Sequence, residues 1–488
     1  MSITEVEQQQ LLIGGEWGGA RSGETFERAD PWSGEVASRA AAASRDDARA
    51  AADAAAAAFG EWSATPPSAR RELLQKAAGL LLERAPDIAH VVTAETGGTF
   101  GWGMFNCSLA AGMLNEAAAQ TTAVTGEVIP SDVPGLTAMA VRQPAGVVLG
   151  IAPWNAPVIL GTRAVATPLA FGNTVVLKAS EVCPHTHGEI ARAIADAGVP
   201  AGVINLITHE ADAAADVVDE LIAHPAVRRI NFTGSTRVGR LVAENAARHL
   251  KRVLLELGGK APLIVLADAD LDEAVAAAKF GAFMHQGQIC MSTERIVAVD
   301  SVAGEVASRL GEKAAALRVG DPRDPETEIG PLVSSGSLER IGELVDDARS
   351  KGAEVVTGGE AEGPCYRPTV LAGVTPEMRI YHEESFGPVV GIVSVDGPEE
   401  AVRVANDTEY GLAASVFGED VPTALDLARQ IESGICHVNG ATVHDEPQMP
   451  FGGVKASGFG RFGGKAAIDE FTELRWITVQ HGSRHYPL

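Results

Sequence analysis

The sequence predicts an α/β protein built from a doubly wound unit and a second α/β unit, and three features of the chain lead to that fold class. Its 488 residues, 46% of them hydrophobic, exceed the usual size of one domain and can bury two or three cores. From residue 145 onward, short β-rich runs punctuated by glycine alternate with helical stretches, as expected of parallel βαβ units. The alternation begins again after Gly258, which indicates a second α/β unit.

The segment before residue 145 is expected to be mostly helical after a short β-hairpin. Residues 11–17 are typical of the hairpin, and residues 30–35 of a turn. Residues 44–59 are rich in alanine and begin with a serine cap and two aspartates, so we expect a helix there and another over residues 70–84. Apolar side chains then recur at helical spacing, which suits either core packing or a pocket wall, at Trp102, Phe105, Leu109 and Met113.

Two sets of strands follow. The first is expected at residues 145–151, 173–178, 203–207 and 229–233. The second is expected at residues 263–266, 296–299, 389–393 and 437–439. Ligands of a doubly wound sheet bind beyond the carboxyl ends of its strands, so functional side chains are expected there. Residues 471–479 alternate like a terminal edge strand, which invites pairing with another subunit.

Composition narrows the class of function. The 39 basic and 64 acidic residues give a formal net charge of −25, which argues against nucleic acid or an anionic membrane as a partner. Five cysteines without a CxxC pair predict neither a disulfide framework nor a metal site, and they favour the reducing cytoplasm. Residues 1–7 lack an apolar signal segment, and no later run approaches the roughly 20 apolar residues of a membrane helix. We expect a soluble, unprocessed protein.

Polar side chains stand at the ends of the first two long strands. Asn155 follows one of them, where its amide could donate to an oxyanion, or could simply cap a helix starting near Pro157. Lys178 ends the next strand, and Glu181 lies three residues further on. Together they suit the hydroxyls of a ribose, although a solvated surface pair would look the same. A carboxylate there would repel a 2′-phosphate, which favours NAD over NADP.

A third strand end suits a pyrophosphate. Phe232-Thr233-Gly234-Ser235 joins a strand to a helix beginning near Thr236, whose N-terminal N–H groups can hold phosphate oxygens. The stretch is neither GxGxxG nor a Walker loop, because Arg240 and Leu241 stand where the latter needs Lys and Ser or Thr. Alone, this signal has low specificity.

A carboxylate and a thiol form the candidate catalytic pair. Glu256 ends an apolar strand before two glycines, and Cys290 follows Gln286-Gly287-Gln288-Ile289. Alternatively, Glu256 is an ordinary turn residue and Cys290 is a buried structural cysteine. The polar neighbours of Cys290 favour an accessible loop, in which a thiol with a lowered pKa attacks a carbonyl. Glu256 would then serve as general base.

Seven motifs occur in the order in which they are found in the NAD(P)-dependent aldehyde dehydrogenase superfamily, which the chain resembles over nearly its whole length. Residues 102–106 and 437–446 are most similar to the aromatic-aldehyde branch, which comprises the vanillin, benzaldehyde and salicylaldehyde dehydrogenases. The seven motifs are Pro153-Trp154-Asn155, Lys178-Ala179-Ser180-Glu181, Phe232-Thr233-Gly234-Ser235-Thr236, Leu255-Glu256-Leu257-Gly258-Gly259-Lys260, Gln286-Gly287-Gln288-Ile289-Cys290, Glu383-Glu384-Ser385-Phe386-Gly387-Pro388 and residues 450–458.

The resemblance implies a mechanism and a set of cofactor contacts. Cys290 would attack the aldehyde, the Asn155 amide and the Cys290 N–H would hold the oxyanion, and hydride would pass to NAD. Glu256 would activate the water that hydrolyses the thioester. Glu384 would hold the nicotinamide ribose, with Phe386 beside the ring. The full set expected to bind the cofactor is Ile151, Pro153, Trp154, Lys178, Glu181, Phe232, Gly234, Ser235, Val238, Gly239, Leu257, Glu384 and Phe386.

The resemblance also implies an aldehyde dehydrogenase fold, with a Rossmann-like cofactor domain, a second α/β catalytic domain and a small β extension for oligomerisation. We expect a homodimer or homotetramer. The expected segments are residues 1–120, the first part of the cofactor domain; 121–144, a bridging and oligomerisation hairpin; 145–256, the Rossmann-like part; 257–455, the catalytic domain; and 456–488, a return segment with a C-terminal oligomerisation strand.

Substrate choice is expected to depend on the helix after Asn155, because Ile159 and Arg163 share its face at i+4 and i+8. Many relatives carry large aromatic residues at the positions of Ala156 and Arg163. A small and a cationic residue here would admit a flat ring, and Arg163 could attract a phenolic oxygen, although a structural salt bridge is the equal alternative. The expected apolar walls are Trp102, Phe105, Met291 and Phe451.

Other outcomes stay open. Phe462 stands where many relatives have a glutamate assigned to proton relay, which leaves Glu256 as the obvious base in these motifs. That base favours water over coenzyme A as the acceptor of the thioester. The remaining alternatives are an aliphatic or semialdehyde substrate, or a catalytically silent NAD-binding protein.

Overall fold

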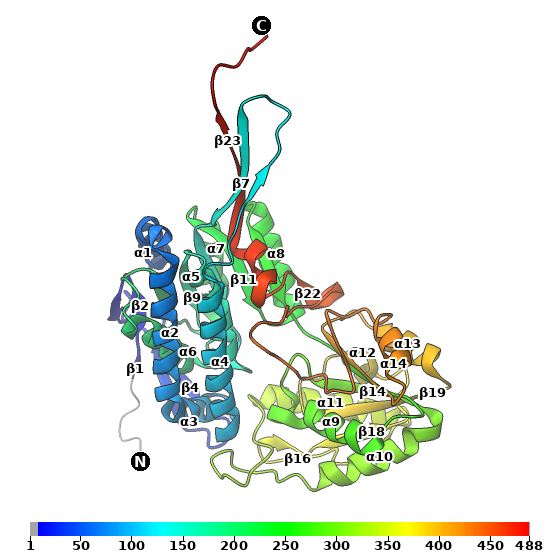
Figure 1. The fold of residues 1–488 in the computed structure, drawn as a ribbon. Helices are drawn as coiled ribbons and strands as arrows, with labels where there is room; N and C mark the ends of the chain where they lie inside the picture. Colours follow the sequence, from blue (N-terminus) through cyan, green and yellow to red (C-terminus); the bar gives the residue numbers. More distant parts are fainter. Residues whose placement is uncertain (1–7, 488) are drawn as a thin grey trace.

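The computed structural model describes residues 8–487, which form two α/β bodies and a projecting β arm (Figure 1). The α/β fold class predicted from the sequence is therefore confirmed. The expectation for residues 1–7 lies outside the described part of the chain. Within residues 8–487, no helix combines the length and apolar character needed to cross a membrane.

The first body is organised on an eight-stranded sheet with the order β22-β12-β11-β8-β9-β10-β2-β3. Its five central strands, β8 to β12, run parallel, whereas β2 and β22 pair antiparallel at either side. The strands β8, β9 and β10 are buried along their whole length. The strands are β2 (Leu11–Ile13), β3 (Glu16–Gly18), β8 (Val147–Ile151), β9 (Thr174–Lys178), β10 (Ile204–Ile207), β11 (Val227–Thr233), β12 (Arg252–Glu256) and β22 (Gly458–Phe459).

Helices cover both faces of this sheet, and each face has its own hydrophobic core. On one face α5 and α6 pack on the strands, with α2, α3 and α4 outside them; the other face carries α1, α7 and α8. Ser44 caps α1 in a reciprocal capping box with Asp47, as its sequence predicts. The helices are α1 (Arg45–Ala64), α2 (Pro67–Glu83), α3 (Ala85–Thr96), α4 (Phe100–Gln120), α5 (Pro157–Ala170), α6 (Pro184–Asp196), α7 (Ala214–Ala223) and α8 (Thr236–Arg248).

The second body contains a seven-stranded sheet with the order β15-β18-β19-β14-β13-β20-β21, parallel except for β15. Its core is separate from the two of the first body. The strands are β13 (Ala261–Val265), β14 (Thr293–Val299), β15 (Glu354–Thr357), β18 (Thr369–Ala372), β19 (Val389–Val395), β20 (Ala413–Phe417) and β21 (Ile435–Val438). The helices are α9 (Leu271–Phe283), α10 (Asp300–Ala315), α11 (Ser335–Ser350), α12 (Arg379–His382), α13 (Pro398–Asn406) and α14 (Val421–Ala428).

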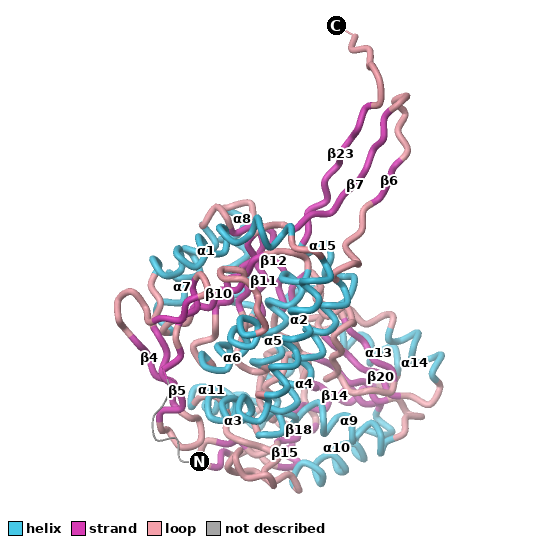
Figure 2. Tube along the Cα trace, turned by 60° about the vertical axis from the view of Figure 1, so that its left-hand side comes forward, coloured by secondary structure: helices cyan, strands magenta, loops and turns pink. Residues whose placement is uncertain are grey.

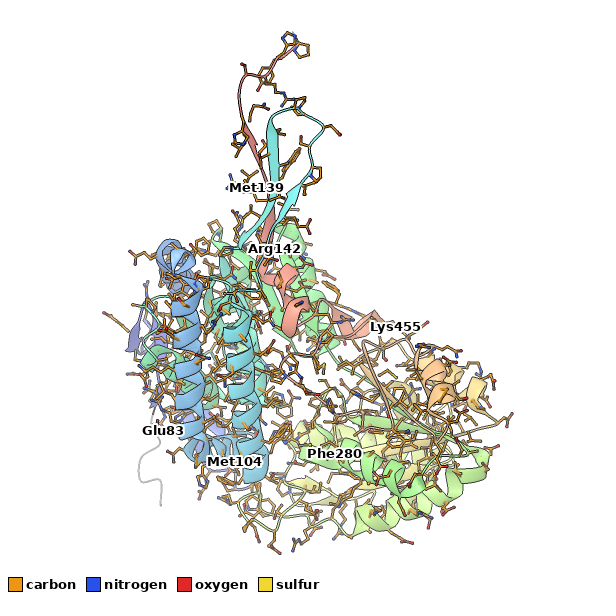
Figure 3. The ribbon with its side chains drawn as sticks, viewed as in Figure 1. Glu83, Met104, Met139, Arg142, Phe280 and Lys455 are labelled. Carbon is orange, nitrogen blue, oxygen red and sulfur yellow. The ribbon has the colours of Figure 1, made fainter. Side chains whose placement is uncertain are left out.

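The arm is a three-stranded antiparallel sheet that extends away from both bodies in two views (Figures 1 and 2). Its strands are β6 (Glu127–Ile129), β7 (Leu136–Pro144) and β23 (Thr472–Gln480). The terminal strand β23 pairs with β7 over its whole length, while its other edge is open. Figure 3 labels Met139 and Arg142 on β7, and Arg142 donates a hydrogen bond to Thr472 across the pair.

Small elements complete the molecule. A three-stranded sheet joins β1 (Gln8–Gln9), β5 (Val36–Ala41) and β4 (Thr25–Ala29), and a two-stranded ribbon joins β16 (Ala361–Glu362) and β17 (Cys365–Tyr366). The short helix α15 (Ile468–Phe471) leads into β23. Glu256 is the last residue of β12 in the first body, and Cys290 precedes β14 in the second. The candidate pair therefore lies where the two bodies meet.

Candidate active site

The candidate nucleophile Cys290 follows a sharply turned segment. His285, Gln286 and Gly287 have φ angles of +48°, +56° and +69°, so three successive residues adopt the left-handed region. For residues other than glycine this conformation costs about 1–2 kcal/mol each, so surrounding contacts must hold it. Gln286 supplies such contacts by donating from Nε2 to the carbonyls of Gly97 and Pro331.

The loop around Cys290 is buried, so the expectation of an accessible polar loop is wrong. Gln286 and Gln288 are fully buried, and Ser292 donates its hydroxyl to the Gly287 carbonyl inside the same loop. The polar side chains that suggested exposure instead satisfy buried backbone groups, as buried polar groups must. Cys290 itself is half-buried, and it lines a cavity.

That cavity has a volume of about 350 Å³ and places the predicted substrate residues beside the nucleophile. Cys290 and Asn155 line it together with all six residues expected to form the substrate pocket, namely Trp102, Phe105, Ile159, Arg163, Met291 and Phe451. The sequence reasoning missed several apolar members of the wall and one acid, namely Leu160, Phe280, Met284, Ile289, Val443 and Asp445. The lining is mainly apolar, which suits a small uncharged ligand.

Asn155 is anchored next to the nucleophile loop rather than at a helix cap. The N-cap of α5 is Ala156, which has no side-chain capping bond, so the capping alternative is wrong. The Asn155 side chain donates from Nδ2 to the Gln288 carbonyl at 2.9 Å, and the backbone carbonyl of Asn155 accepts from Trp102 Nε1 at 3.1 Å. An amide has two N–H groups, so a second donor remains beside Cys290.

Glu256 is a buried carboxyl group, 2% exposed, and neither oxygen has a hydrogen-bond partner among residues 8–487. Burial raises its pKa to about 8, because a charge is poorly stabilised in a dry interior. Burial also raises the pKa of the Cys290 thiol above its ordinary value, and the nearby Glu256 adds to that effect. The protein groups around Cys290 therefore do not lower the pKa of its thiol. The site disfavours charge on either group.

A groove of about 450 Å³ lies beyond the carboxyl ends of β8, β9 and β11, where ligands of such sheets bind. Four residues of the predicted cofactor set line it, namely Ile151, Lys178, Phe232 and Val238. Lys178 is buried, which lowers its pKa from the ordinary value, and the charge of Glu181 opposes that shift. The groove therefore combines apolar walls and the buried ammonium of Lys178 with polar side chains, namely Asp219, Glu244, Asn245 and Arg248.

The remaining predicted cofactor residues frame this groove and its approach to Cys290. Ser235 caps α8 by accepting from the Val238 N–H, and a side chain on Gly239 would come within 2.4 Å of Leu257 Cδ2. A side chain on Gly234 would meet the Phe232 ring at 2.6 Å. Pro153 and Trp154 follow β8 directly. Packing against Phe232 and Leu257 therefore leaves no room for a side chain at either glycine.

Glu384 and Phe386 lie on a loop that reaches the base and the nucleophile segments. Glu384 Oε1 accepts from the Gly259 N–H at 2.9 Å, and burial raises the pKa of Glu384 to about 7. Phe386 has a φ angle of +52°, and its ring meets Trp154 edge-on with centroids 5.7 Å apart. The predicted contributors of both domains therefore converge on one region.

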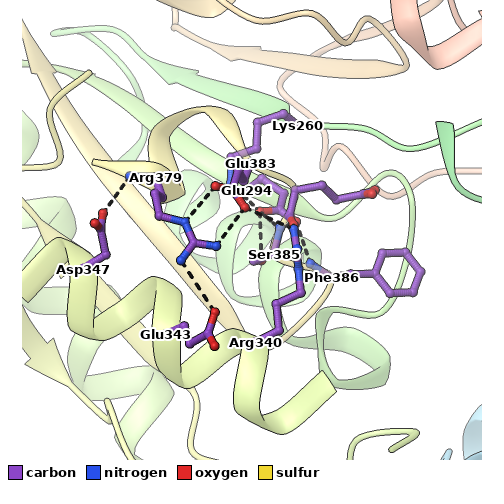
Figure 4. A network of polar contacts seen from close by, with 10 residues as sticks. Lys260, Glu294, Arg340, Glu343, Asp347, Arg379, Glu383, Ser385 and Phe386 are labelled. Atoms are coloured by element: carbon purple, nitrogen blue, oxygen red, sulfur yellow. Dashed lines mark hydrogen bonds and ion pairs between the residues drawn. The ribbon is translucent and has the colours of Figure 1, made fainter. Parts of the chain in front are cut away.

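A buried ion pair fixes these segments relative to one another (Figure 4). The Glu294 carboxylate accepts from Lys260 Nζ at 2.7 Å, from the N–H and hydroxyl of Ser385, and from the N–H of Phe386. Lys260 comes shortly after Glu256 in the chain, and Glu294 shortly after Cys290. Ser385 directly follows Glu384, the candidate ligand of the ribose. The pair thus joins three parts of the site. Its role could not be predicted from motif membership alone, because Glu294 belongs to none of the seven motifs.

Arg163 takes part in a buried salt bridge and also lines the cavity. Its Nη2 donates to Asp445 Oδ2, with the two side chains 7% and 11% exposed, and its guanidinium stacks on Phe451 at 4.2 Å from the ring centroid. Phe462 is buried behind them, 5.8 Å from the guanidinium and 6.2 Å from the Phe471 ring. The residue that departs from many relatives therefore packs as part of an aromatic wall.

Comparison with known proteins identifies the family. Residues 17–477 match the aldehyde dehydrogenase family. The chain is 58% identical over 478 residues to a vanillin dehydrogenase of a Pseudomonas sp., covering 98% of this chain and 99% of the relative. It is 40% identical over 491 residues to a benzaldehyde dehydrogenase [NAD(+)] of Pseudomonas putida, covering 99% and 100%.

A solved structure gives the same result. The salicylaldehyde dehydrogenase from Pseudomonas putida G7 complexed with salicylaldehyde superposes with a TM-score of 0.97 at 47% identity, covering 99% of this chain and all of that one. The fold and the match along almost the whole sequence agree. The chain belongs to the aldehyde dehydrogenase family.

Proposed function

We propose that this enzyme oxidises an aromatic aldehyde to the carboxylic acid, with NAD as the hydride acceptor. The observation that carries the proposal is the cavity of about 350 Å³, in which Cys290 and Asn155 lie among apolar and aromatic side chains. A flat ring matches such walls better than a charged aliphatic chain does. Relatives that are 58% and 47% identical are named for vanillin and salicylaldehyde, which supports the same class of substrate.

The catalytic residues act on the aldehyde carbon in turn. The sulfur of Cys290, as the thiolate, forms a bond to the carbonyl carbon, and the C=O π pair moves to the oxygen. The free Asn155 N–H and the Cys290 backbone N–H stabilise the resulting oxyanion. NAD bound in the groove would accept the hydride that leaves when the adduct collapses. A thioester on Cys290 remains.

Hydrolysis of the thioester is assigned to Glu256. Its two oxygens have no hydrogen-bond partner within residues 8–487, and its pKa of about 8 suits a base that takes a proton from water near neutral pH. The water oxygen bonds to the acyl carbon, the carbon–sulfur bond breaks, and the acid leaves. A base in this position favours water over coenzyme A as the acceptor.

A spectrophotometric panel tests the proposal. The purified enzyme is mixed with NAD and benzaldehyde, vanillin, salicylaldehyde, hexanal or succinate semialdehyde, and NADH absorbance is followed. We expect the largest kcat/KM for the aromatic members. Higher values for hexanal or the semialdehyde would replace the aromatic assignment by the aliphatic alternative. A flat trace with every aldehyde would instead favour a silent NAD-binding protein.

We infer that NAD is preferred to NADP because Glu181, close enough to Lys178 to affect its pKa, places a carboxylate beside the groove. One relative is named as NAD-dependent, whereas a solved structure 35% identical is described as NADP-dependent, so the family accepts either cofactor. The ratio of kcat/KM for NAD to that for NADP should fall in Glu181→Gln. The exposed Glu210→Gln serves as the matched control.

We further propose that the arm joins subunits into a homodimer or homotetramer. Its three strands expose apolar side chains far from either core, including Trp476 at 76% and Val128 at 75% exposure. Monomeric proteins seldom expose contiguous apolar patches of this kind.

Five free cysteines suit the reducing cytoplasm as the place where the enzyme works.

A further inference from the structure

Asp445 is a charged residue of the cavity lining that the mechanism does not use. Its Oδ2 accepts from Arg163. Its Oδ1 is buried and has no hydrogen-bond partner among the residues that the structure describes. A buried carboxylate oxygen left unpaired costs free energy that folding alone does not recover. Such an oxygen, on a residue that lines the substrate cavity, is an acceptor without a donor.

We propose that Asp445 Oδ1 accepts a hydrogen bond from a hydroxyl group on the ring of the substrate, so that this enzyme selects hydroxylated aromatic aldehydes over their ethers. The inference rests on the proposed function, and it narrows the substrate class from aromatic aldehydes to phenolic ones. An ionised carboxylate can only accept, and in this apolar cavity the donor it lacks must come from the ligand.

Arg163 has a different role from a free cation that attracts phenolate. It already pairs with Asp445, so the two side chains together present no net charge to the cavity. Its stacking on Phe451 fixes the guanidinium and thereby fixes the carboxylate. A guanidinium has five N–H donors, so others can donate to the oxygen of the same hydroxyl. The pair therefore matches a neutral phenol, which both donates and accepts.

The other titratable groups around this point favour a neutral ligand. The pKa values of Glu256 and Cys290 both respond to the charges of Arg163 and Asp445, which places all four groups near one another. Burial holds the pKa of Glu256 at about 8 and that of the thiol above its ordinary value. His444 lines the same cavity and bonds Glu446. A phenolate here would face the carboxylate of Asp445, and above a pH of about 8 also the ionised carboxylate of Glu256.

Matched substrate pairs measure the effect in the wild-type enzyme. The 2-, 3- and 4-hydroxybenzaldehydes are compared with the corresponding methoxybenzaldehydes, in which the donor is lost. Because a hydrogen bond to a charged group is strong, we expect kcat/KM for at least one hydroxy isomer to exceed that of its ether by about 10- to 100-fold. Ratios below about 3 for all three pairs, at NADH production that is clearly measurable, would overturn the inference.

Two variants test the residue itself. In Asp445→Leu the hydroxy-to-methoxy ratio should fall to near 1. Because that change leaves the buried Arg163 unpaired, the double variant Arg163→Met/Asp445→Leu removes the pair as a unit, a replacement that buried ion pairs often tolerate. Its ratio should also be near 1. Asp426→Asn, in an exposed pair with Arg429, should keep the wild-type ratio. A wild-type ratio in the double variant would refute the role of Asp445.

The pH dependence of the same ratio separates a bound phenol from a bound phenolate. Changes in Cys290 and Glu256 affect both members of a pair and cancel. The ratio should fall as pH rises through the phenol pKa of the free substrate, because the phenolate cannot donate. A ratio that rises would assign the site to phenolate attraction by Arg163 instead. Absence of NADH with every aldehyde, benzaldehyde included, would reject the proposed function rather than this inference.

Discussion

Burial of Glu256 disfavours its ionised form and at the same time gives it a pKa that suits a base. It is a carboxylic acid in a dry site, without a hydrogen-bond partner in residues 8–487, and burial holds its pKa near 8. If it is the base for hydrolysis, Glu256→Gln should stop the reaction after the thioester forms. We expect one NADH per active site in a rapid burst, followed by steady turnover lower by about 10²- to 10⁴-fold. Stopped-flow absorbance measures both phases.

The control and the contrary outcome for this variant are direct. Glu312→Gln, on an exposed face of α10, should keep the steady rate. A steady rate in Glu256→Gln close to that of wild type would show that another group activates water. A loss of the burst itself would show that Glu256 acts before the thioester, for example in deprotonating Cys290.

The pH dependence of turnover follows from the same pKa. Only the deprotonated form of Glu256 can accept a proton, so hydrolysis-limited turnover should rise with pH up to about 8 and then level. Stability should change in the opposite sense, because the pKa of about 8 in the folded state exceeds the ordinary 4.5. That group stabilises the fold fully below pH 4.5, and the contribution is lost as pH rises through 8. Thermal unfolding of wild type and Glu256→Gln should therefore diverge over this window, with the variant gaining.

Asn155 gives a second prediction at the scale of one residue. Its Nδ2 is held by the Gln288 carbonyl beside Cys290, which positions the second N–H for an oxyanion. Removal of one such donor costs roughly 3 kcal/mol, so Asn155→Ala should lower the burst rate by about two orders of magnitude. The NAD dissociation constant, measured by fluorescence titration, should change little. An unchanged burst rate would contradict the assignment.

At the scale of elements, the Lys260–Glu294 pair joins three segments of the site. Both side chains are buried, and Glu294 also holds the Ser385-Phe386 backbone. Glu294→Gln leaves the Lys260 charge without its partner, which should reduce the free energy of unfolding by about 3–5 kcal/mol. The same substitution should loosen the loop that carries Glu384, so KM for NAD should rise more than KM for the aldehyde. Urea unfolding and steady-state kinetics measure these effects.

An exposed ion pair supplies the control for that prediction. Glu305 bonds Arg309 on the surface of α10, so Glu305→Gln should change the free energy of unfolding by less than about 0.5 kcal/mol. Equal effects of the two substitutions, or an aldehyde KM that rises as much as the NAD KM, would show that the buried pair does not position the cofactor loop.

The strands were easier to predict from sequence in the first body than in the second. The β-rich runs at residues 145–151 and 173–178 gave β8 and β9 because both are short, fully buried strands between glycine-marked turns. The strands β18 and β20 went unpredicted. Their sequences, TVLA and AASVF, are too short and too small in side chain to stand out, and they become strands by pairing with β19 and β13.

At the scale of the whole molecule, the arm should determine the oligomeric state. Trp476 is 76% exposed on β23, and Leu474 and Val479 on the same strand are 60% and 42% exposed. If they meet a second subunit, Trp476→Glu should weaken association by about 10- to 100-fold, as loss of an aromatic anchor does. Sedimentation equilibrium would then detect monomers at micromolar concentration.

The matched control for the arm is Val421→Glu, an exposed apolar residue on α14, which should leave the mass unchanged. Activity measured alongside would show whether the cleft between the bodies survives dissociation. A wild-type enzyme that sediments as a monomer, or a Trp476→Glu protein that keeps the wild-type mass, would contradict the role of the arm.

The sequence by itself determined the chemical groups and the order in which the chain supplies them. Alternating strands and helices indicated two α/β units, and the ordered motifs identified Cys290, Glu256 and Asn155 as candidates. These are local properties, because strand periodicity, turns and motif residues depend on near neighbours along the chain.

Only the tertiary structure decided what surrounds those groups. The polar neighbours of Cys290 indicated exposure, but Gly97 and Pro331 meet Gln286 and bury the loop. Asp445 is 282 positions from Arg163, and their pairing follows from packing that no local pattern records. Burial then sets the pKa of Glu256, because desolvation depends on every segment that closes over a carboxylate. The sequence identified Glu256 as the candidate base, and the fold sets its pKa.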